Sequence, residues 1–127
     1  MRYLDYETLL ELYFYIVRDV MHSVDAGILS EDAIRSALAR PQHAAHYEDA
    51  DGFRQAAFLF HGLIKAHGFL DGNKRAAFLG LGWFLHNNGL GKIDAATGEI
   101  VGFCLGSAEG ALSIDDIERW LRDRVQL

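Results

Sequence analysis

Four charged residues stand close together in a stretch of the chain that is otherwise apolar. From residue 55 to residue 91 there are 37 residues, and the only charged ones are Lys65, Asp71, Lys74 and Arg75. The segments on either side, AAFLFHGLI and AAFLGLGWFL, are apolar nearly all round, which is typical of helices at the centre of a fold. The sequence therefore predicts two buried helices that meet at a short turn, with a local charge of +2 at that turn.

The order of these residues suggests an anion site. If Asp71 caps the second helix, Gly72, Asn73, Lys74 and Arg75 form its first turn. That end of a helix carries partial positive charge and free N–H groups, so two cations there are unfavourable unless an anion is bound. Glycine lets a ligand come close to the backbone, and a phosphate fits the combination of amides and cations.

His67 and Asp71 could supply the chemistry around such a phosphate. A neutral imidazole can accept a proton from a hydroxyl group, and a carboxylate beside phosphates commonly holds Mg²⁺. The alternative is structural. Asp-Gly-Asn is ordinary turn chemistry, Asp71 would then serve only as a cap, and His67 would be a structural histidine. Phe69, between them, is expected in the core under either interpretation.

Helical periodicity recurs along the whole chain, and no run alternates as a strand does. The expected helices run from about Glu7 to Val24, from Ser30 to Pro41, from about Gly52 to Ala66, from Lys74 to His86, from Asp94 to about Leu105, and from Ser113 to the end.

Local signals set the expected boundaries of these helices. Ser30 and Asp94 are predicted N-caps, and Ser113 with Asp116 resembles a capping box. Pro41 is expected to stop the second helix, which leaves residues 42–51 as a polar loop. Gly27 is expected to end the first helix, and Asn87-Asn88-Gly89 the fourth.

Composition excludes several classes of protein. The 127 residues are 50% hydrophobic and 24% charged, which excludes a disordered tail and fits one all-α domain, residues 1–127, of about six helices. The single cysteine, Cys104, excludes an intramolecular disulfide framework. A net charge of −6 argues against direct nucleic-acid binding through a broad basic face. With no signal peptide and no long apolar run, a cytoplasmic protein with no membrane partner is expected.

A zinc site is the weaker of the remaining hypotheses. His43 and His46 precede Glu48 and Asp49, but a His-x-x-His spacing without a clear helix or a partner pair is a weak metal signal. A solvated loop is the favoured interpretation of this stretch.

The segment HGFLDGNKR, His67 to Arg75, resembles the signature H-x-F-x-[D/E]-[G/A]-N-[G/K]-R of the Fic/Doc superfamily. The resemblance extends to ALARPQ, to the NNG after the core helix and to the short C-terminal helix, and these features favour the Doc ("death on curing") toxin branch. Lys74 stands where AMP-transferring Fic proteins have glycine, and Phe78 stands where they usually have a second arginine. Lysine in the glycine's place is typical of Doc proteins.

The resemblance implies a Fic/Doc-like helical bundle and a kinase reaction. In Doc proteins the γ-phosphoryl group of ATP is transferred to a threonine of elongation factor Tu, which stops translation. By the same resemblance, His67 is the base, Asp71 holds Mg²⁺, and Gly72, Asn73, Lys74 and Arg75 form the phosphate cradle, with Lys65 as a basic neighbour.

Two other functions stay open at this point: a Fic-type AMP transferase, and a non-catalytic member that only binds a nucleotide or a partner. The intact His67 and Asp71 favour an enzyme, because a binding module needs no base. The inhibitory motif [S/T]-x-x-x-E-[G/N] of self-restrained Fic proteins is absent from the chain. The resemblance therefore implies an antitoxin whose disordered C-terminal segment folds into a hydrophobic groove of this protein.

Overall fold

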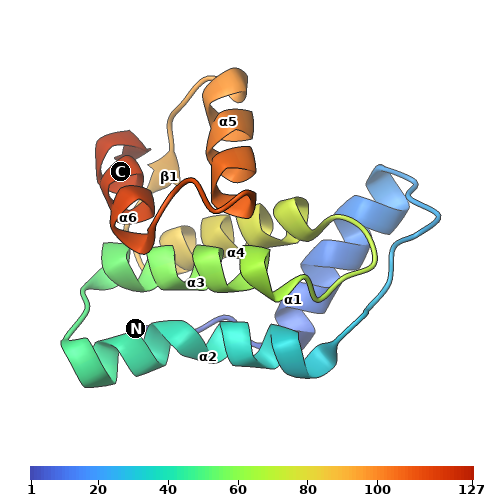
Figure 1. The fold of residues 1–127 in the computed structure, drawn as a ribbon, viewed down its shortest axis with the longest axis horizontal. Helices are drawn as coiled ribbons and strands as arrows, with labels where there is room; N and C mark the ends of the chain where they lie inside the picture. The colour runs from blue at the N-terminus through green and yellow to red at the C-terminus, as the bar shows by residue number, and fades with distance from the viewer.

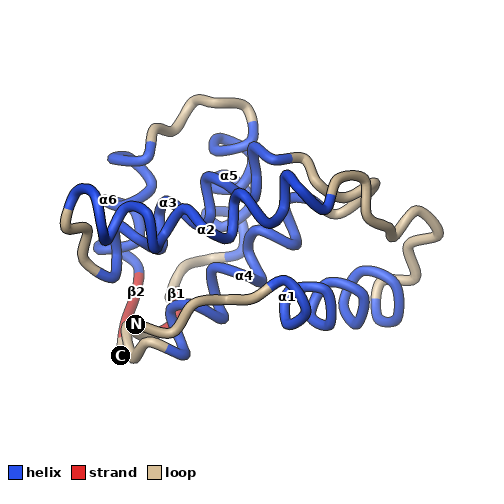
Figure 2. Tube along the Cα trace, turned by 90° about the horizontal axis from the view of Figure 1, so that it is seen from below, coloured by secondary structure: helices blue, strands red, loops and turns tan.

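Two apolar helices, α3 (Gly52–Ala66) and α4 (Asn73–Asn87), form the centre of the molecule (Figure 1). The computed structural model describes residues 1–127, of which 68% are helical, and loops and one short strand pair make up the rest (Figure 2). The other elements are α1 (Tyr6–Tyr13), the π-helix η1 (Phe14–Val20), α2 (Glu31–Glu48), β1 (Lys92–Ile93), α5 (Thr97–Ala108), α6 (Ile114–Arg124) and β2 (Val125–Gln126). The prediction of an all-α fold in one compact domain is confirmed.

One continuous hydrophobic core joins the helices. On α3 and α4 the fully buried side chains include Phe60, Leu81 and Phe84. Stacked rings extend the core toward the C-terminus, because Phe103 lies 4.8 Å from Phe60 and 3.9 Å from Trp120 between ring centroids. Burial of this much aromatic and aliphatic surface is the main term that stabilises the fold.

Side-chain caps begin several of the helices, and those at Ser30 and Ser113 confirm the prediction. Ser30 accepts a hydrogen bond from the backbone N–H of Ala33, and Asp51 from that of Arg54. Ser113 and Asp116 form a complete capping box at the start of α6. Each cap satisfies backbone donors that the first turn of a helix leaves free.

The prediction that Pro41 ends the second helix is wrong. Pro41 lies inside α2, which continues to Glu48, so the expected polar loop over residues 42–51 is mostly helix. The pyrrolidine ring is fully buried, and α2 packs along α3 over its length. Tertiary packing therefore outweighs the hydrogen bond that proline removes from the helix.

Three further boundaries differ from the prediction. The first helix changes to π-helical geometry at Phe14 and ends at Val20, short of Val24. Asp94 caps no helix, because α5 begins at Thr97 after Ala96. Residues 92–93 instead pair antiparallel with residues 125–126, so Val125 belongs to a strand and not to the last helix. None of the helices has the length and apolar content that crossing a bilayer requires.

Candidate functional site

Residues 67–72 form the turn between the two central helices. His67 ends α3 with a φ of 48°, and Gly72 precedes α4 with a φ of 81°. A left-handed backbone is uncommon for a residue other than glycine, so His67 is held there by its surroundings. At Gly72 a Cβ atom would lie 3.1 Å from a methyl group of Val17, and the positive φ would strain it further. Glycine is therefore strongly favoured at this position.

The segment 27–30 holds the turn from one side. The carbonyl oxygen of Gly68 accepts hydrogen bonds from the N–H groups of Leu29 (2.7 Å) and Ser30 (3.0 Å), and Leu70 donates to Gly27 (2.9 Å). Phe69 is buried and stacks on Tyr13 with 3.9 Å between ring centroids, which confirms its predicted place in the core. The turn is thus fixed by backbone pairing and by one aromatic anchor.

Asn73 fixes the turn from the other side. Its side-chain oxygen accepts from the N–H of Phe69 (2.9 Å), and its amide group donates to the carbonyl of Phe69 (2.8 Å). The same amide lies 3.4 Å from Nδ1 of His67, which is exposed. The side chain of Asn73 is therefore used to shape the turn, and this residue offers a ligand its backbone N–H.

The structure corrects the role of Asp71 as the helix cap. The N-cap position of α4 is Gly72, and the carboxylate of Asp71 accepts from the N–H of Gly72 (2.9 Å) and from Oγ of Ser23 (2.7 Å). The first helical hydrogen bond is from Ala76 to Gly72, so the N–H groups of residues 73–75 have no partner. These three free donors at a helix start form the kind of site that binds anions.

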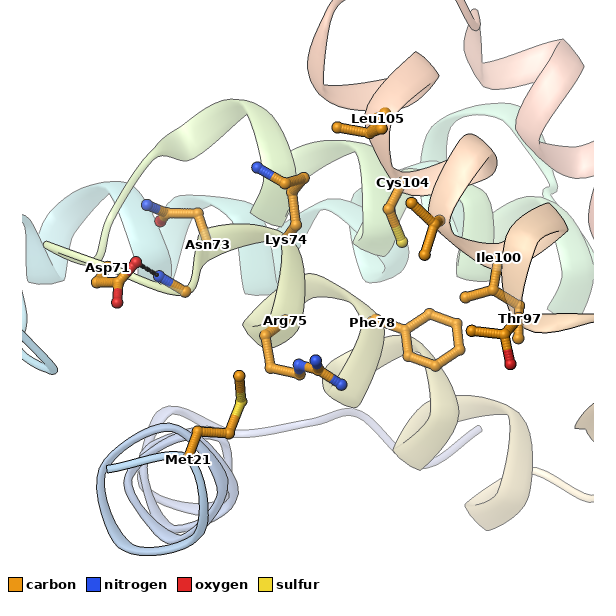
Figure 3. A pocket seen from close by; sticks show the side chains of 12 residues that line it. Met21, Asp71, Asn73, Lys74, Arg75, Phe78, Thr97, Ile100, Cys104 and Leu105 are labelled. Carbon is orange, nitrogen blue, oxygen red and sulfur yellow. Dashed lines mark hydrogen bonds between the residues drawn. The ribbon is translucent and has the colours of Figure 1, made fainter. Parts of the chain in front are cut away.

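A pocket of about 510 Å³ lies in front of these donors (Figure 3). Lys74 and Arg75 line it, both exposed, and neither has a carboxylate within 4 Å. The opposite wall comes from α5. The complete lining is Met21, Asp71, Gly72, Asn73, Lys74, Arg75, Phe78, Thr97, Ile100, Val101, Cys104 and Leu105. The pocket thus has a cationic end at the start of α4 and an apolar end against α5.

Two predicted site residues lie outside the lining of this pocket. His67 lies on the turn beside Asn73. Lys65 is on α3, donates a hydrogen bond to the carbonyl of Ala108 (3.3 Å), and lines a different cavity. The structure therefore groups Asp71, residues 72–73 and the two cations, and it separates Lys65 from them.

Tyr13 and Ser23 belong to the site but were not predicted from the sequence. The hydroxyl of Tyr13 donates to the carbonyl of Asp71 and accepts from the N–H of Gly27 (3.2 Å), so it joins both sides of the turn. Burial raises the pKa of Tyr13, which keeps this hydroxyl protonated. In the sequence Tyr13 is one member of an apolar helical stripe, and Ser23 has no motif at all. No sequence pattern predicted that residues of α5 would line the pocket either.

The same pocket contains the only cysteine of the chain. Burial raises the pKa of the Cys104 thiol, against the opposing effect of the nearby Arg75 and Lys74 charges. The thiol is therefore protonated at neutral pH and acts as a small apolar group in the pocket wall.

Comparison with known proteins agrees with this geometry. No curated protein matches the chain. The model of the Fic/DOC family matches residues 3–85, a range that contains the turn, all of α3, α4 except its last two residues, and the elements that hold the turn. The chain therefore belongs to the Fic/DOC family, whose members are typically enzymes that modify proteins.

Proposed function

We propose that this protein is a Doc-type toxin that transfers the γ-phosphoryl group of ATP to a threonine hydroxyl of elongation factor Tu. The observation that carries the proposal is the pairing of two free cations, Lys74 and Arg75, with three free N–H groups at the start of α4. A helix start normally repels lysine and arginine, so this arrangement is stable when an anion such as a phosphate chain is bound.

The reaction needs little covalent chemistry from the protein. The hydroxyl oxygen attacks the γ-phosphorus, the bond from that phosphorus to the bridging β,γ oxygen breaks, and ADP leaves. His67 accepts the proton of the hydroxyl, since its ring is exposed beside the turn. The amides and cations stabilise the charge that spreads over the phosphoryl oxygens.

Asp71 fits a magnesium site of the usual nucleotide-dependent kind. Mg²⁺ in such sites is held by one or two carboxylates together with substrate phosphates and water, and it neutralises charge on the phosphates. Asp71 is the one carboxylate that lines the pocket, and hydrogen bonds from Ser23 and Gly72 hold it in place. Each of its oxygens keeps a further lone pair for a metal.

The identity of the transferred group decides between the kinase and the alternative AMP transferase. Lys74, in the position where AMP-transferring Fic proteins have glycine, favours the kinase, because its charge competes for the most negative phosphate. Purified protein, Mg²⁺ and elongation factor Tu are incubated with ATP labelled in the γ or the α position. We expect label on the factor from γ-labelled ATP only. Label from α-labelled ATP only would show an AMP transferase.

His67→Ala tests whether the motif is catalytic at all. Transfer should fall to background in this variant, whereas His46→Ala, an exposed histidine on α2, should keep full activity. Equal transfer by His67→Ala and wild type would exclude His67 as the base. No transfer by the wild-type protein with either label would favour the non-catalytic alternative.

A toxin of this type also implies an antitoxin, acting with it in the cytoplasm. The apolar lining of the pocket supports this part of the proposal, because Val101 and Leu105 of α5 and Met21, after η1, are exposed. A disordered segment recovers its ordering entropy by burying such surface. Expression of the protein alone should arrest growth, and co-expression of the neighbouring reading frame should restore it. Harmless expression at a high level without a partner would contradict the toxin assignment.

A further inference from the structure

Cations without an acidic partner gather at a second place, between α2 and α3. Six of the nine arginines have a carboxylate within 4 Å, and the exceptions are Arg2, Arg40 and Arg75. Arg75 belongs to the pocket described above. Arg40 lies on α2, in a cavity that it shares with Lys65 of α3, and Lys65 also lacks a carboxylate partner. An acidic protein that leaves these two charges uncompensated offers an anion site there.

Arg40 is held in place without being neutralised. Its aliphatic stem crosses α3 at Gly62, where an added Cβ would lie 2.9 Å from Cδ of Arg40. Its guanidinium group is 3.1 Å from Nδ1 of His61 and stacks over the ring of Phe58 at 5.2 Å. Burial and the charges of Arg40 and Lys65 lower the pKa of His61, so this ring is neutral at pH 7 and accepts the hydrogen bond. The charge of Arg40 therefore stays free for a ligand.

The cavity around Arg40 has a volume of about 760 Å³ and is lined by small and basic residues. Its lining is Ala33, Arg35, Ser36, Ala37, Ala39, Arg40, His43, Gly62, Lys65 and Ala66. None of these residues is acidic, and none is Phe, Tyr or Trp. Arg35, at one end, is already paired with Glu31 (2.9 Å) and Glu7 (3.7 Å). Arg40, His43 and Lys65 are the groups available to an anionic ligand, and the ammonium of Lys65 also donates to the carbonyl of Ala108 (3.3 Å).

The shape of this groove favours an extended ligand with several separate negative charges. It follows α2 from Ala33 to His43, a rise of about 15 Å at 1.5 Å per residue. Because α2 and α3 run antiparallel, Lys65 lies near the Ala33 end and Arg40 with His43 near the other. Alanine and serine side chains leave room for an extended backbone between the charged groups. No Phe, Tyr or Trp lines the groove to stack on a nucleobase, which disfavours a single-stranded nucleic acid.

We propose that the groove between α2 and α3 binds an acidic peptide segment of a partner protein, with carboxylates on Arg40 and Lys65. Ala66, at the Lys65 end of the groove, directly precedes His67 in the chain. A segment bound there runs toward the candidate base. The binding itself does not depend on the proposed phosphoryl transfer, so it can be measured without ATP.

The test is fluorescence anisotropy with two labelled peptides, one of alternating glutamate and alanine and one of alternating glutamine and alanine. Wild-type protein should bind the glutamate peptide, more weakly as salt is raised, and should not bind the glutamine peptide. Arg40→Gln and Lys65→Gln should each weaken binding by about threefold to fivefold, and the double variant by about tenfold or more.

A matched control removes one positive charge elsewhere. Arg119→Gln lies on α6, where Arg119 pairs only with Asp116 of the same helix, and it should bind the glutamate peptide as the wild type does. Lys65 is exposed, so Lys65→Gln tests the groove even if Arg40→Gln unfolds the protein. The proposal is overturned by equal binding of both peptides, by an equal effect of Arg119→Gln, or by tighter binding of a labelled single-stranded oligonucleotide.

Discussion

At the scale of single residues, function depends on charges whose positions are unfavourable without a ligand. Lys74 and Arg75 stand at the start of α4, where the helix dipole opposes them by a few tenths to about 1 kcal/mol each. Neither pairs with Asp71, because the carboxylate is held by Ser23 and Gly72. The protein thus keeps two cations and one anion apart within one pocket, which suits a ligand that carries both phosphates and a metal.

Lys74→Gly tests the contribution of the ammonium group. We expect phosphoryl transfer to fall by at least about 10²-fold, the usual effect of removing one preorganised stabilising group. Lys74→Ala separates this effect from the flexibility of glycine, since alanine removes the ammonium and favours the helix. Both variants should lose activity to a similar extent, and the thermal unfolding temperature of Lys74→Ala should not fall below that of the wild type. Normal transfer by Lys74→Ala would exclude Lys74 from the phosphate cradle.

Ser23→Ala tests the orientation of Asp71. The hydroxyl of Ser23 lies 2.7 Å from Oδ2 of the carboxylate, and a hydrogen bond to a charged group contributes about 1.5–3 kcal/mol at most. Because the pair is exposed, we expect a smaller effect, about threefold to tenfold weaker binding of Mg²⁺-ATP by titration calorimetry. Binding of ATP with EDTA present should change less, because Ser23 acts through the carboxylate. Gln42→Ala, on the exposed face of α2, is the control.

At the scale of elements, the close packing of α3 against α4 fixes the position of the turn at residues 67–72 that joins them. Gly80 of α4 allows this approach, since an added Cβ would lie 2.9 Å from Cδ1 of Leu63 and 3.1 Å from Cδ2 of Leu4. Both neighbours are buried, so neither can move freely. Two residues further along the same helix, Gly82 has open space around it. One glycine is required by packing and the other is not.

Gly80→Ala and Gly82→Ala should therefore change stability in opposite directions. Alanine favours a helix over glycine by about 0.5–1 kcal/mol at either position. At Gly82 this gain stands alone, so we expect the free energy of unfolding in urea to rise. At Gly80 overpacking costs about 1–3 kcal/mol and outweighs the gain. A rise of the same size in both variants would show that the contact between α3 and α4 is looser than described.

At the scale of the whole molecule, charges join the C-terminal helix to the rest. Arg122 of α6 donates to the carboxylate of Asp51 (2.6 Å), which also caps α3. Arg54 of α3 reaches Asp115 (2.8 Å) and Glu118 (2.9 Å) of α6. These contacts join the start of α3 to α6. Because α6 follows α5 in the chain, they also help to hold α5, which forms the second wall of the pocket.

Asp51→Asn tests this connection through its pH dependence. The hydrogen bond from Arg122, followed by that from the Arg54 amide, lowers the pKa of Asp51 in the folded protein. A lowered folded-state pKa gives stability that is present above the unfolded value, about 4, and is lost as the pH falls through the folded value. Asparagine still caps the helix, so the variant loses only the ion pair.

At pH 7 this variant should unfold about 2–4 °C below the wild type, which corresponds to less than about 1 kcal/mol for a partly exposed pair. The difference should close as the pH falls below about 4. Asp123→Asn, on α6 and without an ion pair within 4 Å, should show no such gap. If the difference in unfolding temperature between Asp51→Asn and the wild type persisted unchanged at low pH, the effect would come from the helix cap and not from the ion pair.

The sequence by itself determined the features that depend on neighbours in the chain. Helical periodicity, the caps at Ser30 and Ser113 and the apolar character of the two central helices follow from local chemistry, and the structure confirms them. The motif at residues 67–75 identified the family for the same reason, because its spacing is a local property.

Only the tertiary structure decided which distant residues meet. Pro41 remains in a helix because burial against α3 outweighs its local preference. Asp94 caps no helix, because it follows a strand pair between residues 92–93 and 125–126 and donates its N–H to the carbonyl of Arg124. The contact of Ser23 with Asp71 joins residues 48 positions apart, and the second pocket wall comes from α5. Such contacts depend on how the helices pack in space, and packing is decided by the sum of many weak burial terms that no local pattern contains.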